Sequence, residues 1–192
     1  FPGGKEWRWL DIRDFHLQSD RVRSADYNKR STDIYLKPDG PRDGQRYLYY
    51  RDNNGLYSVE AVRGINPFWE GDYATVYFSF VPPNGIEYPN KNVYLFGQLT
   101  NYNLADSLRM IFNPDTGIYE THLLMKQGYY DYTFVGVDKN NPNIQSELDG
   151  NYYETENNYT ILVYYKSFTD RSDQLIVVAT FDSRTDQPGL SF

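Results

Sequence analysis

The sequence predicts an all-β protein, and three observations lead to this prediction. Short segments of alternating apolar and polar residues recur along the chain, each bounded by Gly, Pro, Asn or Asp, as expected for half-buried strands joined by turns. Aromatic residues, which favour strands, make up 18% of the 192 residues and include 20 Tyr. No segment has the 3.6-residue apolar spacing of an amphipathic helix.

The alternation is clearest at residues 73–81, where Phe78 and Phe80 share one face and Tyr77 lies on the other. We therefore expect phenylalanine to fill much of the core and part of the tyrosine excess to cover a recognition surface. The predicted core phenylalanines are Phe78, Phe80, Phe96 and Phe134, and the predicted outward tyrosines are Tyr73, Tyr77, Tyr102 and Tyr129.

Turn residues divide the alternating segments into strands. Residues 113–117 read Asn-Pro-Asp-Thr-Gly, a sequence typical of a tight hairpin turn. The predicted strands are, in chain order, residues 6–16, 33–37, 46–50, 57–62, 73–81, 92–96, 107–112, 118–125, 129–135, 159–166 and 174–181. Net charge is positive up to residue 65 and negative after it, and the Gly and Pro residues at 63–67 mark the predicted boundary between two parts.

Composition excludes several classes of protein. The net charge of −7 argues against a nucleic-acid partner, which needs a positive surface. The sequence has no apolar run of the roughly 20 residues that a membrane-spanning helix needs. Cysteine is absent, so disulfides and thiolate chemistry are excluded. Because the chain starts Phe-Pro-Gly-Gly without an initiator Met, we interpret it as a fragment or a processed product.

Catalytic motifs are also missing, and we predict no enzymatic activity, no metal and no cofactor. His16 and His122 are the only histidines, and neither has metal-ligand spacing to an acidic residue. Carboxylates cluster around residues 150–153. A glycosidase pair and a calcium site are alternatives, but we favour a solvated acidic rim. The cluster consists of Glu147, Asp149, Glu154 and Glu156.

Residues 93–138 resemble the early-set immunoglobulin-like domains that include glycogen-binding modules. The resemblance lies in a strand ending at Gly97, an Asn-aromatic loop, a hairpin and the Tyr-x-Tyr-x-Phe strand that follows Gly128. It implies an immunoglobulin-like β-sandwich over residues 66–192, preceded by a smaller β-region over residues 1–65. It also implies an alternative function, carbohydrate binding, with Tyr102 as the loop aromatic and Thr133 where many such modules carry Lys.

A second resemblance spans nearly the whole chain. Residues 1–13, 147–165 and 171–176, together with the strand after Lys126, are similar to the plug proteins of the type IX secretion system of Bacteroidota. These proteins carry a signal peptide and a leading β-domain. The resemblance implies a periplasmic, non-enzymatic module whose partner is the outer-membrane β-barrel translocon, which it closes. The tripeptide 106–108 also resembles a short O-glycosylation signal of periplasmic proteins in this phylum, which makes Ser107 a candidate acceptor.

Two groups of residues carry the second resemblance. Trp7 and Trp9 share one face of a predicted strand, with Asp11 and Arg13 nearby. We interpret the two tryptophans as sealing the seam between the two parts rather than binding sugar.

The second group lies in the motif Gly-Asn-Tyr-Tyr-Glu-Thr-Glu-Asn at residues 150–157. We expect it to pin the connection before the last two strands, with direct contact to a partner as the alternative. Its candidate residues are Gly150, Tyr153, Glu154, Thr155 and Asn157.

Overall fold

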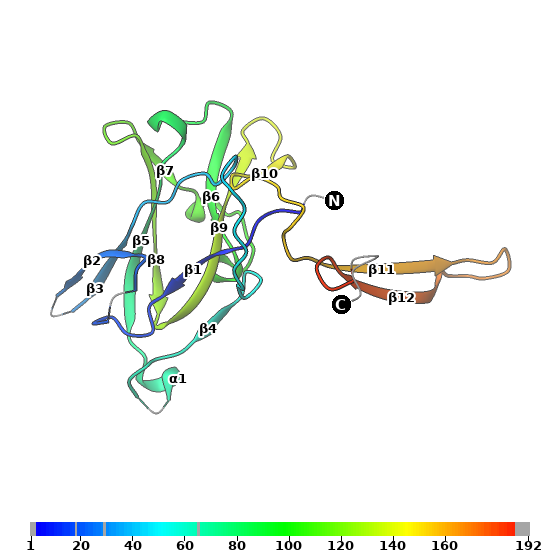
Figure 1. Ribbon diagram of the computed structural model, residues 1–192, viewed down its shortest axis with the longest axis horizontal. Coiled ribbons are helices and arrows are strands. Elements are labelled where there is room, and N and C mark those ends of the chain that lie inside the picture. Colours follow the sequence, from blue (N-terminus) through cyan, green and yellow to red (C-terminus); the bar gives the residue numbers. More distant parts are fainter. Residues whose placement is uncertain (1–2, 18, 29, 65, 187–192) are drawn as a thin grey trace.

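The computed structural model describes residues 3–17, 19–28, 30–64 and 66–186, and it confirms the all-β sandwich (Figure 1). One sheet has the strand order β2-β3-β5-β8-β7, in which β3 and β5 are parallel and the other pairs are antiparallel. Its strands are β2 (Val22–Tyr27), β3 (Thr32–Leu36), β5 (Tyr73–Phe80), β7 (Ile111–Asn113) and β8 (Ile118–Lys126).

The other sheet is built around β9 (Gly128–Asp138), which pairs with four strands. β1 (Arg8–Asp11) and β4 (Tyr57–Val59) both pair with residues 129–130 and therefore lie on opposite edges of β9. β6 (Lys91–Phe96) and β10 (Gln145–Glu147) flank residues 135–137 in the same way. β8 and β9 are separated by one residue, so the chain crosses there from one sheet to the other.

Aromatic side chains join the two sheets. The Phe78 and Tyr132 rings meet edge to face with centroids 5.2 Å apart, and those of Phe80 and Phe134 lie 4.8 Å apart. All four side chains are almost completely buried, which confirms Phe78, Phe80 and Phe134 as core residues. Phe96 is only half-buried and belongs to the site described below.

The predicted boundary at residue 65/66 runs through both sheets. β1 and β4 hydrogen-bond to β9, and β3 hydrogen-bonds to β5. Residues 1–65 therefore contribute strands to the sandwich instead of forming a β-region that precedes it. Short helical turns occupy the connections: α1 (Pro67–Glu70), η1 (Pro83–Gly85), η2 (Gln98–Thr100) and η3 (Asp106–Leu108).

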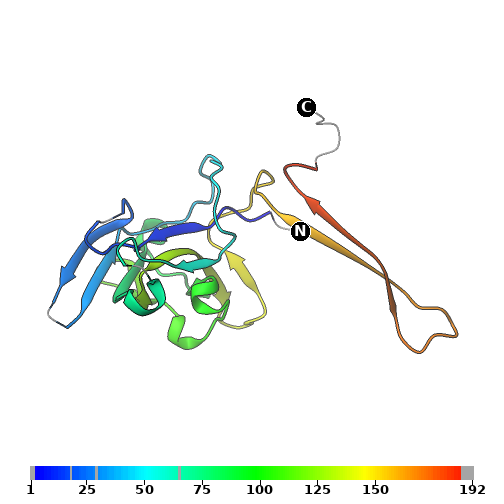
Figure 2. The same ribbon diagram turned by 90° about the horizontal axis from the view of Figure 1, so that it is seen from below.

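The last two strands differ from the prediction that the sandwich includes them. β11 (Asn158–Tyr165) and β12 (Gln174–Asp182) pair with each other and with no other described strand. They form a hairpin that projects from the body of the molecule (Figures 1 and 2). Their residues are apolar on both faces, so these strands lack the polar face of an outer strand of the sandwich.

Other strand predictions also differ from the structure. The predicted strand at residues 107–112 begins too early, because η3 covers residues 106–108 and β7 begins at Ile111. Residues 46–50 form no strand, because the hydroxyls of Tyr47 and Tyr50 bond to the N-terminal segment, at the Glu6 carboxylate and the Trp7 carbonyl. Residues 22–27 form β2, which the sequence pattern missed.

Candidate functional site

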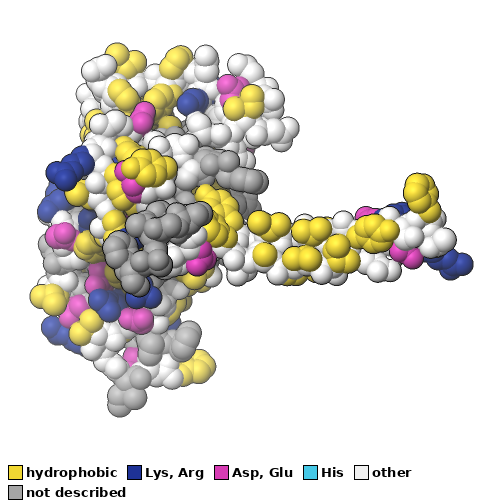
Figure 3. Space-filling model, turned by 45° about the vertical axis from the view of Figure 1, so that its right-hand side comes forward, with side chains coloured by type: hydrophobic (Ala, Val, Ile, Leu, Met, Phe, Trp, Pro, Cys, Tyr) yellow, Lys and Arg dark blue, Asp and Glu magenta, His cyan; other side chains and the backbone are white. Residues whose placement is uncertain are grey.

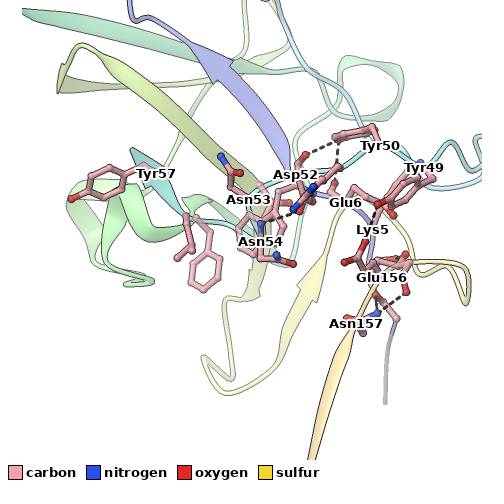
Figure 4. Close-up of a pocket in the computed structure, with 18 of the residues that line it drawn as sticks. Lys5, Glu6, Tyr49, Tyr50, Asp52, Asn53, Asn54, Tyr57, Glu156 and Asn157 are labelled. Carbon is pink, nitrogen blue, oxygen red and sulfur yellow. Dashed lines mark hydrogen bonds between the residues drawn. The ribbon is translucent and has the colours of Figure 1, made fainter. Parts of the chain in front are cut away.

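The candidate site is a cleft of about 750 Å³ at one end of the β9 sheet (Figure 4). Segments distant in sequence meet there: residues 3–7, residues 49–58, parts of β6 and β9, and residues 155–157. The lining combines aromatic rings with carboxylate, amide and guanidinium groups. Its aromatic residues are Trp7, Tyr49, Tyr50, Tyr57 and Phe96.

Trp7 anchors an aromatic cluster at this cleft. Its ring lies nearly parallel to Phe96, with centroids 6.3 Å apart, and edge-on to Tyr102 at 6.4 Å. Gly55 makes room for it, because a Cβ there would lie only 2.7 Å from the indole ring. Trp7 therefore packs against residues from both sides of residue 65.

Tyr102 is held in an unusual backbone conformation. Its φ is +52°, and the preceding Asn101 has the same φ, in the left-handed region that residues other than Gly seldom adopt. The Tyr102 hydroxyl donates to the Gly55 carbonyl oxygen at 3.2 Å, yet the residue remains 45% exposed. Such strain persists only where surrounding contacts enforce it and is often found at binding sites.

Trp9, Asp11 and Arg13 lie elsewhere, along β1 beside Tyr129. The Trp9 and Tyr129 rings stack with centroids 6.1 Å apart and planes 6° apart. Arg13 donates to both carboxylate oxygens of Asp11, at 3.0 and 2.6 Å. Burial alone would raise the pKa of Asp11, but the hydrogen bonds from the Arg13 side chain and backbone outweigh it and lower that pKa. Trp7 and Trp9 therefore pack against different aromatic residues.

A buried ion-pair network fixes the N-terminal segment beneath the cleft. The Arg8 guanidinium bonds to Asp39 at 3.0 Å and also to Asp149. Arg42 reaches Asp149 at 2.8 Å, and Arg21 reaches Asp39 at 2.5 Å. Asp149 is only 1% exposed.

The acidic cluster is therefore not a solvated rim at Asp149. Asp149 neutralises two arginines and also accepts a hydrogen bond from Thr133 at 3.3 Å. Glu156 accepts one from the Tyr49 hydroxyl at 2.9 Å. The side chain of Glu147 lies outside the described part of the chain. Among the described residues, no group of three or more His, Asp and Glu could hold a metal ion.

The motif at residues 150–157 clamps the start of the chain. Thr155 donates its hydroxyl to the Gly4 carbonyl at 2.9 Å, and Asn157 donates its amide to the Gly3 carbonyl at 2.8 Å. Gly150 has a φ of +83°, and a Cβ there would lie 2.9 Å from the Asp43 carboxylate. The motif therefore pins the connection before the last two strands, as the sequence predicts.

Two residues of the motif lie differently from what a strand at these positions would give. In a strand, Tyr153 and Thr155 would share one face and Glu154 and Glu156 the other. Tyr153 is 87% exposed, and the neighbouring Tyr152 takes the inward position, with its hydroxyl 2.8 Å from the carbonyl oxygens of Arg42 and Gln45. Glu154 contributes its backbone carbonyl, which accepts a hydrogen bond from Tyr47 at 3.0 Å. The expected alternation fails because this segment is a turn and not a strand.

Asp131 is a site residue that sequence reasoning missed. Its carboxylate is completely buried on β9 and accepts the backbone N–H groups of Asn53 and Gly55, which holds that loop against the cleft. Burial, with a smaller contribution from the negative charge of Asp52, raises the pKa of Asp131 to about 6. Its other carboxylate oxygen has no hydrogen-bond partner among the residues that the structure describes. The sequence did contain a signal for this residue, since Asp131 is an acidic residue between aromatic residues of a predicted strand.

Two further predictions concern the molecular surface. Ser107 is exposed on the short helical turn η3, and so it is accessible as an acceptor. Over the described ranges, no helix is both long enough and apolar enough to cross a membrane.

The fold and the cleft together define a two-sheet β-protein with a preformed, aromatic-lined surface site. Comparison with known proteins found no matching family model and no matching curated protein. A crystal structure of a hypothetical protein from Parabacteroides merdae is similar, with a TM-score of 0.82 and 31% sequence identity over 95% of this chain. The matched region is 45% of that protein, so the chain spans less than half of its length.

Proposed function

We propose that this chain is a non-enzymatic protein-binding module of the periplasm and that it closes an outer-membrane β-barrel translocon of the type IX secretion system. The observation that carries the protein-binding part is the aromatic cleft built on a buried ion-pair network. The plug role rests on the resemblance of the two end segments, which meet at this cleft.

A protein partner suits the chemistry of the cleft. Tyrosine, tryptophan and arginine dominate the binding energy of protein interfaces. Here Trp7, Tyr57 and Arg51 line the same cleft as Asp52 and Glu156. A volume of about 750 Å³ can take several side chains of a partner loop. The backbone around the cleft is already fixed, so little conformational entropy is lost on binding.

The mechanism that we infer is steric. The two sheets share one core, and buried ion pairs bind the N-terminal segment to the last loop before the hairpin. A body of this stiffness can block a channel mouth without a conformational change of its own, and dissociation from the partner reopens the channel.

Co-purification with the translocon and membrane permeability test this proposal. Tyr57 is exposed at the cleft, and Tyr73 is an exposed tyrosine on the opposite sheet. We expect Tyr57→Ala to weaken co-purification and to let a small dye enter cells, while Tyr73→Ala leaves both unchanged. Equal dye entry with and without the protein, together with no association with the barrel, would contradict the proposal.

Carbohydrate binding is the second candidate, because Tyr102 offers an exposed aromatic ring on a strained backbone beside the cleft. Calorimetric titration with α-glucan oligosaccharides distinguishes the two functions. Saturable heat that Tyr102→Ala abolishes and Tyr73→Ala preserves would favour the sugar. Absence of heat at millimolar oligosaccharide would exclude it.

A further inference from the structure

The β11–β12 hairpin exposes apolar side chains on both of its faces, and Figure 3 shows one of these faces. The register places Ile161 and Val163 beside Ala179 and Val177 on one face, and Leu162 beside Val178 on the other. Residues 158–165 and 174–181 include no charged residue. The large side chains that are at least 36% exposed are Ile161, Leu162, Val163, Tyr164, Tyr165, Phe168, Leu175, Ile176, Val177, Val178 and Phe181.

The exposed apolar surface of the hairpin is larger than monomeric proteins usually present. Eleven large side chains, most of them about half exposed and Phe168 fully exposed, present on the order of 1,000 Å², whereas monomeric proteins seldom expose patches of more than a few hundred Å². A stable interface buries about 800 Å² per partner. A two-stranded hairpin alone is also only marginally stable in water. The hairpin therefore has the surface of an element that another structure covers.

The pattern also indicates what kind of structure covers it. Strands that are apolar on both faces are typical of inner strands of a sheet that is packed on both sides. Among the described strands, β11 and β12 pair only with each other, so both outer edges of the hairpin are available for further strands. A single flat partner surface would leave one face exposed, whereas a β-domain that takes the hairpin into its own sheet covers both.

The position of the chain ends favours a domain of the same polypeptide over a separate protein. Gly3 and Gly4 are bonded to the motif that leads into β11, and Asn157 bonds to Ser183 at the end of β12. Both described ends of the chain thus lie at the base of the hairpin (Figure 1). In the Parabacteroides protein, more than half of the chain lies outside the matched region, and a domain joined at either end would emerge beside the hairpin.

We propose that β11–β12 is an interdomain docking element, which becomes two inner strands of a second β-sheet domain carried on the same polypeptide, as in proteins of the length of the Parabacteroides relative. The inference is independent of the proposed cleft function, because no residue of the hairpin lines the cleft.

Hydrogen–deuterium exchange of two proteins tests it: this 192-residue chain and the full-length Parabacteroides protein. In this chain, we expect amides of β11 and β12 to exchange at nearly the rate of unfolded chain while β5 amides stay protected. In the longer protein, the matching hairpin should exchange at least about 100-fold more slowly. Rapid exchange of the hairpin in both proteins would overturn the proposal.

A second measurement tests the alternative that a second copy of this chain, and not another domain, covers the hairpin. Light scattering after gel filtration should give a monomer mass for the wild type and for Val177→Lys, which places a charge on the hairpin. A wild-type dimer that Val177→Lys converts to a monomer would overturn the proposal in favour of self-association. The cleft variants Tyr57→Ala and Tyr102→Ala should change neither the mass of the protein nor the exchange rate of the hairpin amides. If the hairpin proposal fails, the cleft function can therefore still be tested separately.

Discussion

At the scale of single residues, three buried carboxylates make the ion pairs and hydrogen bonds that connect distant parts of the chain. Asp149 and Asp39 each neutralise two arginines, and Asp131 lies buried among backbone N–H groups. None of these roles follows from the local sequence, because the partners are 18 to 141 positions away. For this reason the sequence alone predicts a solvated rim at Asp149.

Removing Asp149 should be strongly destabilising. Alanine at this position leaves Arg42 without its counter-ion and Arg8 with Asp39 alone, and loss of one partner of a buried pair costs about 3–5 kcal/mol. Urea unfolding of Asp149→Ala should show this loss. Asp173 is exposed on the hairpin side of the molecule, and Asp173→Ala should stay within about 0.5 kcal/mol of the wild type. Similar stabilities for the two variants would show that the ion pairs contribute nothing.

Asp131 should make stability depend on pH. Its folded pKa of about 6 lies above the ordinary value of 3.8, so folding favours the protonated form. The stabilisation that it contributes is complete below about pH 3.8 and is lost as the pH rises through 6, by at most about 3 kcal/mol. An asparagine side chain at this position cannot ionise. Relative to the wild type, Asp131→Asn should therefore gain stability between about pH 4 and pH 8 in urea titrations, and a constant difference would contradict the raised pKa.

At the scale of elements, glycines allow tight turns and close contacts between chain segments. The predicted turn at residues 113–117 forms with Gly117 at a φ of +69° and its N–H bonded to the Asn113 carbonyl at 2.8 Å. The turn prediction is therefore confirmed. Such a turn can be predicted from the sequence because its conformation depends on five adjacent residues. Gly55 differs, since the indole ring that requires its small size comes from Trp7, and only the folded chain brings the two together.

Gly55 and Gly44 provide a matched test of this contact. Both have positive φ, +78° and +72°, but a Cβ at Gly44 would meet no atom of the described residues within 4 Å. Gly44→Ala should lose about 1–2 kcal/mol from backbone strain alone. Gly55→Ala should lose about 1–3 kcal/mol more because the methyl group overlaps the Trp7 ring, and tryptophan fluorescence should change only in this variant. Equal losses in urea unfolding would mean that Trp7 moves aside freely.

At the scale of the whole molecule, both sheets draw strands from either side of residue 65. The change in net charge and the Gly-Pro segment at residues 63–67 suggested a boundary, but β1, β3 and β4 pair with strands beyond it. Strand pairing is set by long-range register and packing, which local composition does not report.

The chain should therefore unfold as one cooperative unit, apart from the projecting hairpin. Residues 66–192 expressed alone lack the strands that flank the first half of β9 and the edge of β5, so we expect no native near-ultraviolet circular dichroism and no sharp urea transition. The control is the intact chain, which should show both the native circular dichroism signal and the sharp urea transition. A cooperative transition of the isolated fragment would show that the sandwich is complete without residues 1–65.

The secondary-structure class, most inner strands, the phenylalanine core and the tight turn follow from the amino-acid sequence, because they depend on alternation and turn residues within a few positions. Four other features follow only from the way the chain folds: residues 1–65 join both sheets, Asp149 is buried, Tyr152 and not Tyr153 packs inward, and the last two strands project. Each of these depends on which distant segments meet, since burial, ion pairing and strand register are properties of the assembled chain.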